Sequence, residues 1–492
     1  MHFNRRSFVA LVVLCSLFMG AFASSASANS QPQSSDPIVN PQQIYTYARM
    51  TSDLKALAKK YPELITLDTA GESEYGRELL TADIGRGPAV ILLLGSHHAR
   101  EWITTVNMMM MLEHMAIQYE NNSSLSGGFK ARELLDHVTF RLLPMVNPDG
   151  VTLQQLGLSA FPKADHAALI GMNGGSANFK RWKANGKGID LNRQYPADWE
   201  HIHFPAAKPS YMNYKGNKPL QAKEVKAVYE LTQRTNPEIA VAYHSSGEIL
   251  YWNFHTKPAN LARDYAFASA YARMTGYRMV TPSANPSGGG FTDWFIQDFG
   301  RPGLTPELGR SAGETNVPLT EWSRIWSQQK NTIWLMAQTA YDLWMKKQQA
   351  APLHTDIRLT AAATAFLYPD LNAQKLGTLS PGRYKTLRKK GDWLEVQPIT
   401  GANDDKTAAK PNKWISSRYV LSGPVDIPEQ LLIELTPEIA SYQSPHEKEP
   451  APQLALQQAS VREVWPDWLL VSTTEGLRWI ERSDAKEILQ QK

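Results

Sequence analysis

The sequence predicts an α/β domain over residues 37–348, followed by two small all-β modules over residues 356–424 and 430–490. In the first part, apolar runs of strand length alternate with helical patterns, which is typical of a sheet covered by helices on both faces. Beyond Ala350 the long helical patterns stop, and short β-type runs form an internal repeat. The chain therefore combines one large mixed domain with two smaller modules of one kind.

The first 28 residues have the features of a secretory signal peptide. Arg5 and Arg6 precede the apolar run 8–22, and residues 26–28 offer a small-residue cleavage site. The two arginines also resemble a twin-arginine export signal, so both export routes stay open. Because Cys15 is the only cysteine and lies in this segment, the mature chain would have no thiol. We expect a secreted protein, extracellular or associated with the cell wall, without a membrane span.

Composition and charge narrow the classes of partner. The chain is 42% hydrophobic and 20% charged, which is ordinary for a globular protein with a sizeable core. Its formal net charge is only +4, and the sequence has no basic cluster interleaved with aromatic residues. These features argue against a nucleic-acid partner. We expect a monomer.

The elements of the α/β domain follow from its hydrophobic patterns. We expect helices over 44–60, 102–119, 221–235, 258–275 and 322–347, and strands over 89–94, 138–143 and 239–243. The methionine-rich run 107–112 is most simply part of a buried helix and not a metal site. Asn147-Pro148-Asp149-Gly150 has the composition of a turn. Residues 171–199 are rich in Gly and Asn, which predicts a long loop, and such loops are usually functional.

The repeat beyond residue 350 consists of four matching pairs of segments. They are Leu359-Thr360 with Leu435-Thr436, Tyr368 with Tyr442, Asp392–Val396 with Asp467–Val471, and Lys413–Ile415 with Arg478–Ile480. The last pair is closer in sequence than the others because the first copy carries an insertion around residues 401–412. We expect this insertion to be a surface loop.

Candidate metal ligands stand where apolar strands end. His98 and Glu101 follow the strand 89–94, and a His and a carboxylate at this spacing can bind one Zn²⁺, although a polar strand end with an ion-paired Glu is the plainer alternative. His244 follows the strand 239–243. Two His and one Glu leave a fourth position on zinc for water, and Glu307 would then act as general base.

Five motifs occur in a fixed order along the chain. They are His98-Ala99-Arg100-Glu101-Trp102, Asn147-Pro148-Asp149-Gly150, Asp190-Leu191-Asn192-Arg193, His244-Ser245 and Pro306-Glu307-Leu308. Together they resemble the zinc carboxypeptidase family of the carboxypeptidase A type, over roughly residues 40–346. The resemblance implies a mixed eight-stranded sheet sandwiched by helices, one Zn²⁺ held by His98, Glu101 and His244, and Glu307 as the catalytic carboxylate.

The same resemblance assigns roles around the metal. It implies that Asp190 orients His98 through the second ring nitrogen, the alternative being an Asp that only stabilises its own loop. Arg193 with Asn192 would bind the free carboxylate of the substrate, a task suited to a planar guanidinium. Arg100 would be a further anion contact or, alternatively, part of a structural salt bridge.

Two positions depart from the family pattern. Where the family places an arginine beside the scissile carbonyl, this sequence has Lys183, which supplies charge without the fork geometry, and Arg181 is a competing candidate. Thr292 occupies the pocket-floor position, and Asn285 occupies the position of a mobile tyrosine in digestive members. Neither residue matches a pocket for basic or large apolar side chains, so an ordinary protein-trimming carboxypeptidase is less favoured.

Two further resemblances concern the substrate. Residues 179–185 and 188–196 are similar to the bacterial subgroup that cleaves γ-D-glutamyl-diaminopimelate bonds in peptidoglycan stem peptides. Residues 379–384, 391–396 and 414–415 resemble bacterial SH3-like domains, which commonly bind cell-wall peptide, although their tryptophans can equally be core residues. The resemblance implies a peptidoglycan peptidase that binds the cell wall. A secreted carboxypeptidase of broad specificity and an inactive wall-binding protein are the alternatives.

Overall fold

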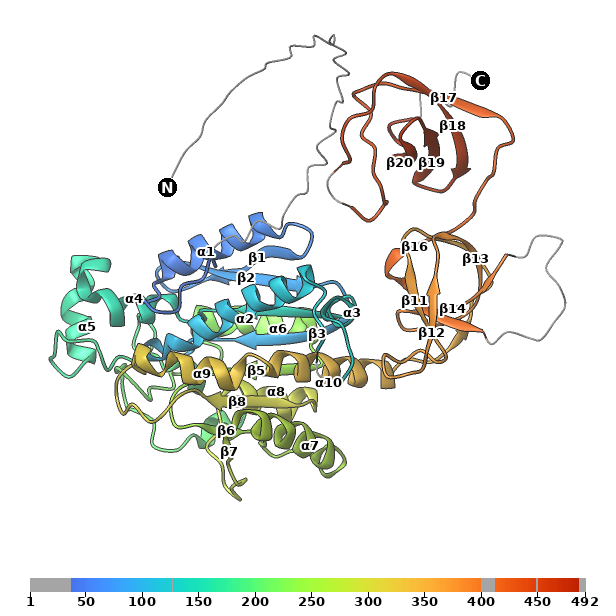
Figure 1. Cartoon of the computed structure of the whole chain (residues 1–492). Coiled ribbons are helices and arrows are strands. Elements are labelled where there is room, and N and C mark those ends of the chain that lie inside the picture. Colours follow the sequence, from blue (N-terminus) through green and yellow to red (C-terminus); the bar gives the residue numbers. More distant parts are fainter. Residues whose placement is uncertain (1–36, 126, 400–411, 448–449, 486–492) are drawn as a thin grey trace, which may run out of the picture. The chain divides into compact units, whose positions relative to one another are not determined.

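The computed structural model describes residues 37–125, 127–399, 412–447 and 450–485 (Figure 1). The predicted signal peptide and nearly all of the predicted insertion around residues 401–412 lie outside the described residues. In the described part of the chain, no helix combines the length and the apolar character that a membrane span requires.

An eight-stranded mixed sheet forms the centre of the large domain, as the sequence predicts. Its strand order is β1-β2-β4-β3-β5-β8-β6-β7. The strands are β1 (Ile65–Glu72), β2 (Glu78–Gly85), β3 (Ala89–Leu94), β4 (Val138–Leu143), β5 (Ile239–Ala242), β6 (Ile249–Tyr251), β7 (Arg278–Met279) and β8 (Gly303–Glu307). The central strands β4, β3, β5 and β8 run parallel, whereas β1, β2 and β6 make antiparallel pairs.

Helices cover both faces of this sheet (Figure 1). They are α1 (Tyr47–Lys60), α2 (Ile103–Glu120), α3 (Ala131–Leu135), α4 (Pro148–Leu156), α5 (His166–Met172), α6 (Lys223–Thr235), α7 (Pro258–Thr275), α8 (Phe291–Phe299), α9 (Trp322–Gln329) and α10 (Thr332–Lys346). Apolar side chains of α1, α2, α7, α9 and α10 belong to one hydrophobic cluster, and those of α6 and α8 belong to another.

Strand β3 is buried on both faces, which explains why its sequence is a continuous apolar run without alternating polar residues. Ile91 and Leu93 pack in one cluster, whereas Leu92 and Leu94 pack in the cluster on the opposite face. A parallel strand at the centre of a covered sheet buries both of its faces. Each fully buried side chain of this kind contributes roughly 1.5–3 kcal/mol through the hydrophobic effect, so the strand anchors the residues that follow it.

Two predicted elements were wrong in detail. The predicted turn at residues 147–150 is the start of helix α4, with the Asn147 side chain accepting a hydrogen bond from the Gly150 N–H at 2.9 Å and Pro148 in the first turn. Asn before Pro is a typical helix start, since Asn caps the free N–H groups and Pro needs no partner for its nitrogen. The predicted helix 322–347 is divided into α9 and α10 at Lys330 and Asn331.

The repeated sequence segments form matching sets of antiparallel strands. The first set is β10 (Asp356–Leu359), β13 (Gly382–Lys390), β14 (Trp393–Pro398) and β15 (Lys413–Ser416), and the second is β17 (Leu431–Leu435), β18 (Gln457–Val464), β19 (Trp468–Thr473) and β20 (Gly476–Glu481). Both sets pair in the same order. Leu394 lies opposite Ile415, and the equivalent Leu469 lies opposite Ile480. The sequence repeat is therefore also a repeat of strand pairing.

The first sheet contains four further strands. They are β9 (Ala351–Pro352), β11 (Ala363–Phe366), β12 (Lys375–Leu379) and β16 (Val420–Ser422). Each sheet has an apolar core of its own. Ile357, Leu394 and Ile415 belong to the first, and Ile433 and Leu469 belong to the second. Both modules thus have the buried aliphatic side chains that a small β-domain requires.

Glu224 on helix α6 leads to a prediction on the pH dependence of stability. Its side chain is completely buried, and burial, with the nearby negative charge of Asp149, raises its pKa to about 8. In the unfolded chain this carboxyl ionises near its ordinary pKa of 4.5. Between these two values folding takes up a proton, so stability falls as pH rises from about 4.5 to about 8, by at most about 1.4 kcal/mol per pH unit.

The glutamine side chain of the Glu224→Gln variant cannot ionise, so we expect the variant to lack this pH dependence of stability. We expect the unfolding temperature of the variant, relative to that of the wild type, to increase as pH rises from 5 to 8. Thermal unfolding at several pH values measures this difference. A difference that is constant over this range would show that Glu224 does not titrate between the folded and unfolded states. The constant part of the difference reports the hydrogen bond that Glu224 accepts from Asn185.

Candidate functional site

The predicted site residues lie at the carboxyl ends of three neighbouring parallel strands. His98 follows β3, His244 follows β5, and Glu307 is the last residue of β8. These strands are adjacent in the sheet, so segments separated by more than a hundred residues meet at one edge. In α/β sheets this edge is the usual place for a ligand site.

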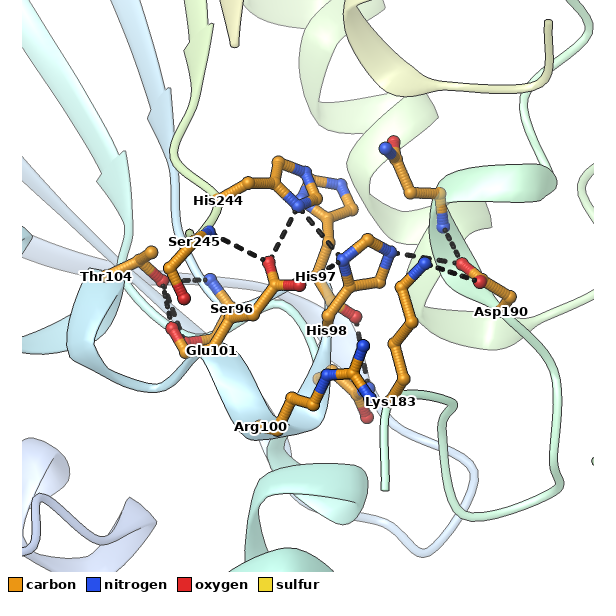
Figure 2. Close-up of polar contacts among 12 residues, drawn as sticks. Ser96, His97, His98, Arg100, Glu101, Thr104, Lys183, Asp190, His244 and Ser245 are labelled. Atoms are coloured by element: carbon orange, nitrogen blue, oxygen red, sulfur yellow. Dashed lines mark hydrogen bonds and ion pairs between the residues drawn. The ribbon is translucent and has the colours of Figure 1, made fainter. Parts of the chain in front are cut away.

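Three side chains form a compact cluster of possible metal ligands (Figure 2). Glu101 lies 2.9 Å from Nδ1 of His98 through Oε1 and 2.9 Å from Nδ1 of His244 through Oε2. The two Nδ1 atoms are 3.0 Å apart. Ligand atoms at 2.0–2.1 Å from a tetrahedral zinc ion are about 3.3 Å apart. The cluster therefore matches both the ligand types and the spacing that zinc requires.

Local structure holds Glu101 in this position. The short 3-10 helix Ala99–Glu101 turns the chain directly after His98, which brings the carboxylate back toward the imidazole. The Ser245 N–H donates a hydrogen bond to Oε2 of Glu101 at 3.2 Å. The Thr104 hydroxyl donates to the backbone carbonyl of Glu101 at 2.8 Å. Because both its backbone and its side chain are held, the carboxylate is oriented before any metal binds.

Asp190 lies against the far side of the His98 ring. Its Oδ1 lies 3.1 Å from Nε2 of His98, on the side of the ring away from the cluster, and it also accepts a hydrogen bond from the Asn192 N–H at 3.2 Å. The carboxyl is completely buried, which raises its pKa, but the positive charge of Lys183 and its contact with His98 hold the pKa well below its ordinary value. Asp190 thus contacts both the ring of His98 and the backbone of its own loop.

Glu307 is placed beside the cluster by backbone pairing. The His244 N–H donates to the carbonyl of Pro306 at 3.0 Å, and the Leu308 N–H donates to the carbonyl of His244 at 2.8 Å. Burial raises the pKa of Glu307 to about 8, and the negative charge of Glu101 acts in the same direction. The structure therefore presents a nearly buried carboxyl group whose proton affinity is higher than that of an ordinary glutamate.

A cavity of about 620 Å³ opens over the cluster. It is lined by every predicted site residue except Asp190, namely His98, Arg100, Glu101, Lys183, Asn192, Arg193, His244, Thr292 and Glu307. The site that the sequence predicts is therefore one continuous space, with the metal cluster and Glu307 on its wall.

Two arginines give this cavity a positive wall. The Arg193 guanidinium donates a hydrogen bond to the backbone carbonyl of its neighbour Asn192 at 2.9 Å. The side-chain Oδ1 of Asn192 accepts a hydrogen bond from the Phe291 N–H at 3.0 Å. Arg193 forms no ion pair with a carboxylate in the described part of the chain, so its charge is available to an anion in the cavity. Arg100 donates to the carbonyl of Arg181 at 3.0 Å, and it has no ion pair with a carboxylate among the described residues.

Arg181, the competing candidate beside the scissile carbonyl, is held away from the cavity. Its guanidinium lies 3.9 Å from the ring centroid of Tyr211 and donates to Oδ1 and to the carbonyl of Asn173. Lys183 lines the cavity instead. The two residues flank the completely buried Trp182 in an irregular part of the loop, and their side chains meet different surroundings.

Polar side chains and one carboxyl group line the part of the cavity around Thr292. Thr292 and Thr305 share a hydrogen bond of 2.6 Å between their hydroxyls. Asp293, the next residue, accepts the Gly290 N–H at the start of α8, and burial raises its pKa to about 6. Asn285 also lines the cavity. The floor therefore offers hydroxyl and amide groups to a polar side chain.

Residues that the sequence did not single out support the cluster from behind. His97 is completely buried, its ring stacks on that of His244 at 5.7 Å, and its Nε2 lies 3.0 Å from the hydroxyl of Tyr195. Burial and the neighbouring histidines hold its pKa well below the ordinary value, so it stays neutral. Tyr251 at the end of β6 lines the cavity. Of the adjacent pair His97-His98, only His98 belongs to the cluster of possible metal ligands.

Comparisons with known proteins agree with this geometry. The model of the zinc carboxypeptidase family matches residues 50–370. The chain is 36% identical over 296 residues to gamma-D-glutamyl-L-diamino acid endopeptidase 1 of Lysinibacillus sphaericus, covering 59% of this chain and 72% of that protein. It is 31% identical over 304 residues to the uncharacterized protein YqgT of Bacillus subtilis (61% and 79%) and 26% identical over 219 residues to carboxypeptidase B of Astacus astacus (43% and 64%).

The matched residues include all three members of the cluster and the whole wall of the cavity above it. The zinc-compatible donor set and the sheet that carries it thus lie within the part of the chain that the family model matches. This chain belongs to the zinc carboxypeptidase family and is a zinc-dependent metallopeptidase.

Proposed function

We propose that this peptidase hydrolyses the amide bond between γ-D-glutamate and the diamino acid of peptidoglycan stem peptides. The observation that carries the proposal is the 36% identity, over 296 residues, to a relative named for this type of bond. The polar cavity wall around Thr292 and Thr305, which also includes Asp293, agrees with it. A diamino acid has a polar side chain, which a floor of hydroxyl groups accepts better than an apolar pocket does.

The chemistry proposed for the centre is hydrolysis by an activated water. Zinc bound by His98, Glu101 and His244 supplies Lewis acidity toward the carbonyl oxygen and toward water. Glu307 takes a proton as water adds to the amide carbon, and gives it to the leaving nitrogen as the C–N bond breaks. A carboxyl group with a raised pKa is suited to both transfers, since its proton affinity lies closer to neutral pH.

The remaining cavity residues are proposed to bind the substrate. Arg193, positioned by Asn192, binds the carboxylate of the diamino acid through two parallel N–H groups, and Arg100 adds a second positive charge on the same wall. Lys183 stabilises negative charge on the carbonyl oxygen, because its ammonium group lies on the cavity wall near Glu307. An anchored carboxylate of a diamino acid does not require the end of a protein chain.

We also propose that the protein is secreted and that its two β-modules are SH3-like domains that bind the cell wall. The signal-like sequence of the first 28 residues supports secretion. The repeated strand pairing, together with the sequence resemblance of the first copy, supports two modules of one kind. Binding to the wall would keep the active site close to stem peptides by raising their effective concentration.

A defined digestion tests the substrate proposal. The zinc-loaded full chain is incubated with L-Ala-γ-D-Glu-diaminopimelate-D-Ala and, separately, with an ordinary α-linked peptide, and the products are identified by mass spectrometry. We expect cleavage after γ-D-glutamate only. Release of C-terminal residues from the α-linked peptide alone would favour a carboxypeptidase of broad specificity. Failure to cleave either peptide would favour the inactive wall-binding protein.

A further inference from the structure

Lys183 is connected to the metal cluster through its backbone. Its carbonyl accepts a hydrogen bond from the Ala99 N–H at 3.0 Å, and Ala99 directly follows the metal ligand His98. The Lys183 N–H donates to the carbonyl of Tyr211 at 2.9 Å. The loop that carries Lys183 is therefore fixed against the segment that carries the first ligand.

The side chain of Lys183 makes a second connection to the same ligand. Its Nζ lies 3.2 Å from Oδ2 of Asp190, while Oδ1 of Asp190 lies 3.1 Å from Nε2 of His98. Figure 2 shows both contacts as dashed lines that end on the Asp190 carboxylate, one from the imidazole and one from the ammonium group. The Asp190 side chain is completely buried, and that of Lys183 is 13% exposed. This is a nearly dry contact, in which electrostatic attraction is weakly screened.

Each carboxylate oxygen of Asp190 has two polar partners in this arrangement. Oδ1 accepts the Asn192 N–H in addition to facing His98, and Oδ2 accepts the Asn213 N–H at 3.1 Å in addition to facing Lys183. With one oxygen anchored by an ammonium group, the plane of the carboxylate is fixed and the other oxygen is aimed at the imidazole. Such partners behind a metal-binding histidine set its orientation and its affinity for metal.

We propose that Lys183 is a positioning residue for the metal centre, which acts through Asp190 on His98 in addition to lining the substrate cavity. Removing its charge leaves the buried carboxylate of Asp190 without its cation, which is unfavourable. The carboxylate then turns toward other donors, and His98 loses the partner that directs Nδ1 at the metal. An ammonium group that only stabilised the carbonyl oxygen would have no such effect in the absence of substrate.

The test is the zinc dissociation constant of the full chain without substrate, measured by competition with a chelator. We expect Lys183→Met to weaken zinc binding by about tenfold or more, since loss of a partner behind a ligand typically costs 10–100-fold. Lys183→Arg keeps a positive charge and should restore most of the affinity. Lys187→Met is the matched control, because this exposed lysine of the same loop lies 4.3 Å from the ring centroid of Tyr75 and not in the cavity.

A double-mutant comparison decides whether the effect passes through Asp190. In an Asp190→Asn background, Lys183→Met should cause little further loss of zinc affinity, because the connection is already broken. Equal zinc affinity of Lys183→Met and the wild type, or an equal loss in both backgrounds, would overturn the proposal. If Lys183→Met unfolds without metal, Lys183→Gln, which keeps a donor but no charge, replaces it with the same expectation. The inference rests on the proposed zinc centre, but zinc affinity is measured without a peptide, so a wrong substrate assignment would not affect it.

Discussion

Glu307→Gln is expected to abolish hydrolysis while zinc stays bound. The amide has nearly the same shape as the carboxylate but cannot accept the proton of the attacking water, and general bases of this kind contribute typically 10²–10⁴-fold to the rate. The backbone of β8, which pairs with the segment of His244, is unchanged by the substitution. We therefore expect a loss of about a thousandfold in kcat, measured on the stem peptide, with an unchanged zinc content by elemental analysis.

Glu230→Gln is a suitable control for this variant. Glu230 lies on α6 with 56% of its side chain exposed and is paired loosely with Lys226 at 3.8 Å, so the same chemical change should leave turnover unaltered. A Glu307→Gln variant that retained turnover would exclude Glu307 as the base. If the variant retained turnover and its pH profile also shifted, the shift would indicate that another group accepts the proton.

The sequence predicted the position of this site because the site depends on strands that are easy to recognise. The apolar run 89–94 could be assigned to a buried strand, and so could the run before His244. A polar residue directly after such a strand must lie at the edge of the sheet. Parallel order then brings the edges of β3, β5 and β8 together. What the sequence alone could not supply was that order, which the structure gives.

Contacts that depend on irregular loops were not predictable in the same way. The contacts that join Lys183 to Asp190 and Asp190 to His98 depend on the conformation of the loop 171–199. No periodic sequence pattern predicts the conformation of such a loop. The choice between Lys183 and Arg181 was open for the same reason. Asn147 was misjudged because Asn, Pro, Asp and Gly favour turns and helix starts alike, and only the chain that follows decides between them.

His244→Ala is expected to remove zinc and with it the stabilisation that zinc gives to the fold. The change deletes one of three ligands and leaves Glu101, which is 5% exposed, facing His98 alone. Two remaining ligands do not make a catalytic zinc site. Elemental analysis should therefore find substoichiometric zinc after dialysis, and hydrolysis of the stem peptide should be lost.

Thermal unfolding with and without a chelator separates the loss of metal from simple damage to the core. Zinc stabilises the wild type by an amount that depends on its concentration relative to its dissociation constant, so a chelator should lower the Tm of the wild type. It should leave the Tm of His244→Ala unchanged, because that variant has no bound zinc to lose. His201→Ala, which alters an exposed histidine, should behave like the wild type in both measurements. If His244→Ala kept its zinc and its chelator-dependent Tm, the ion would have to be held by residues other than this cluster.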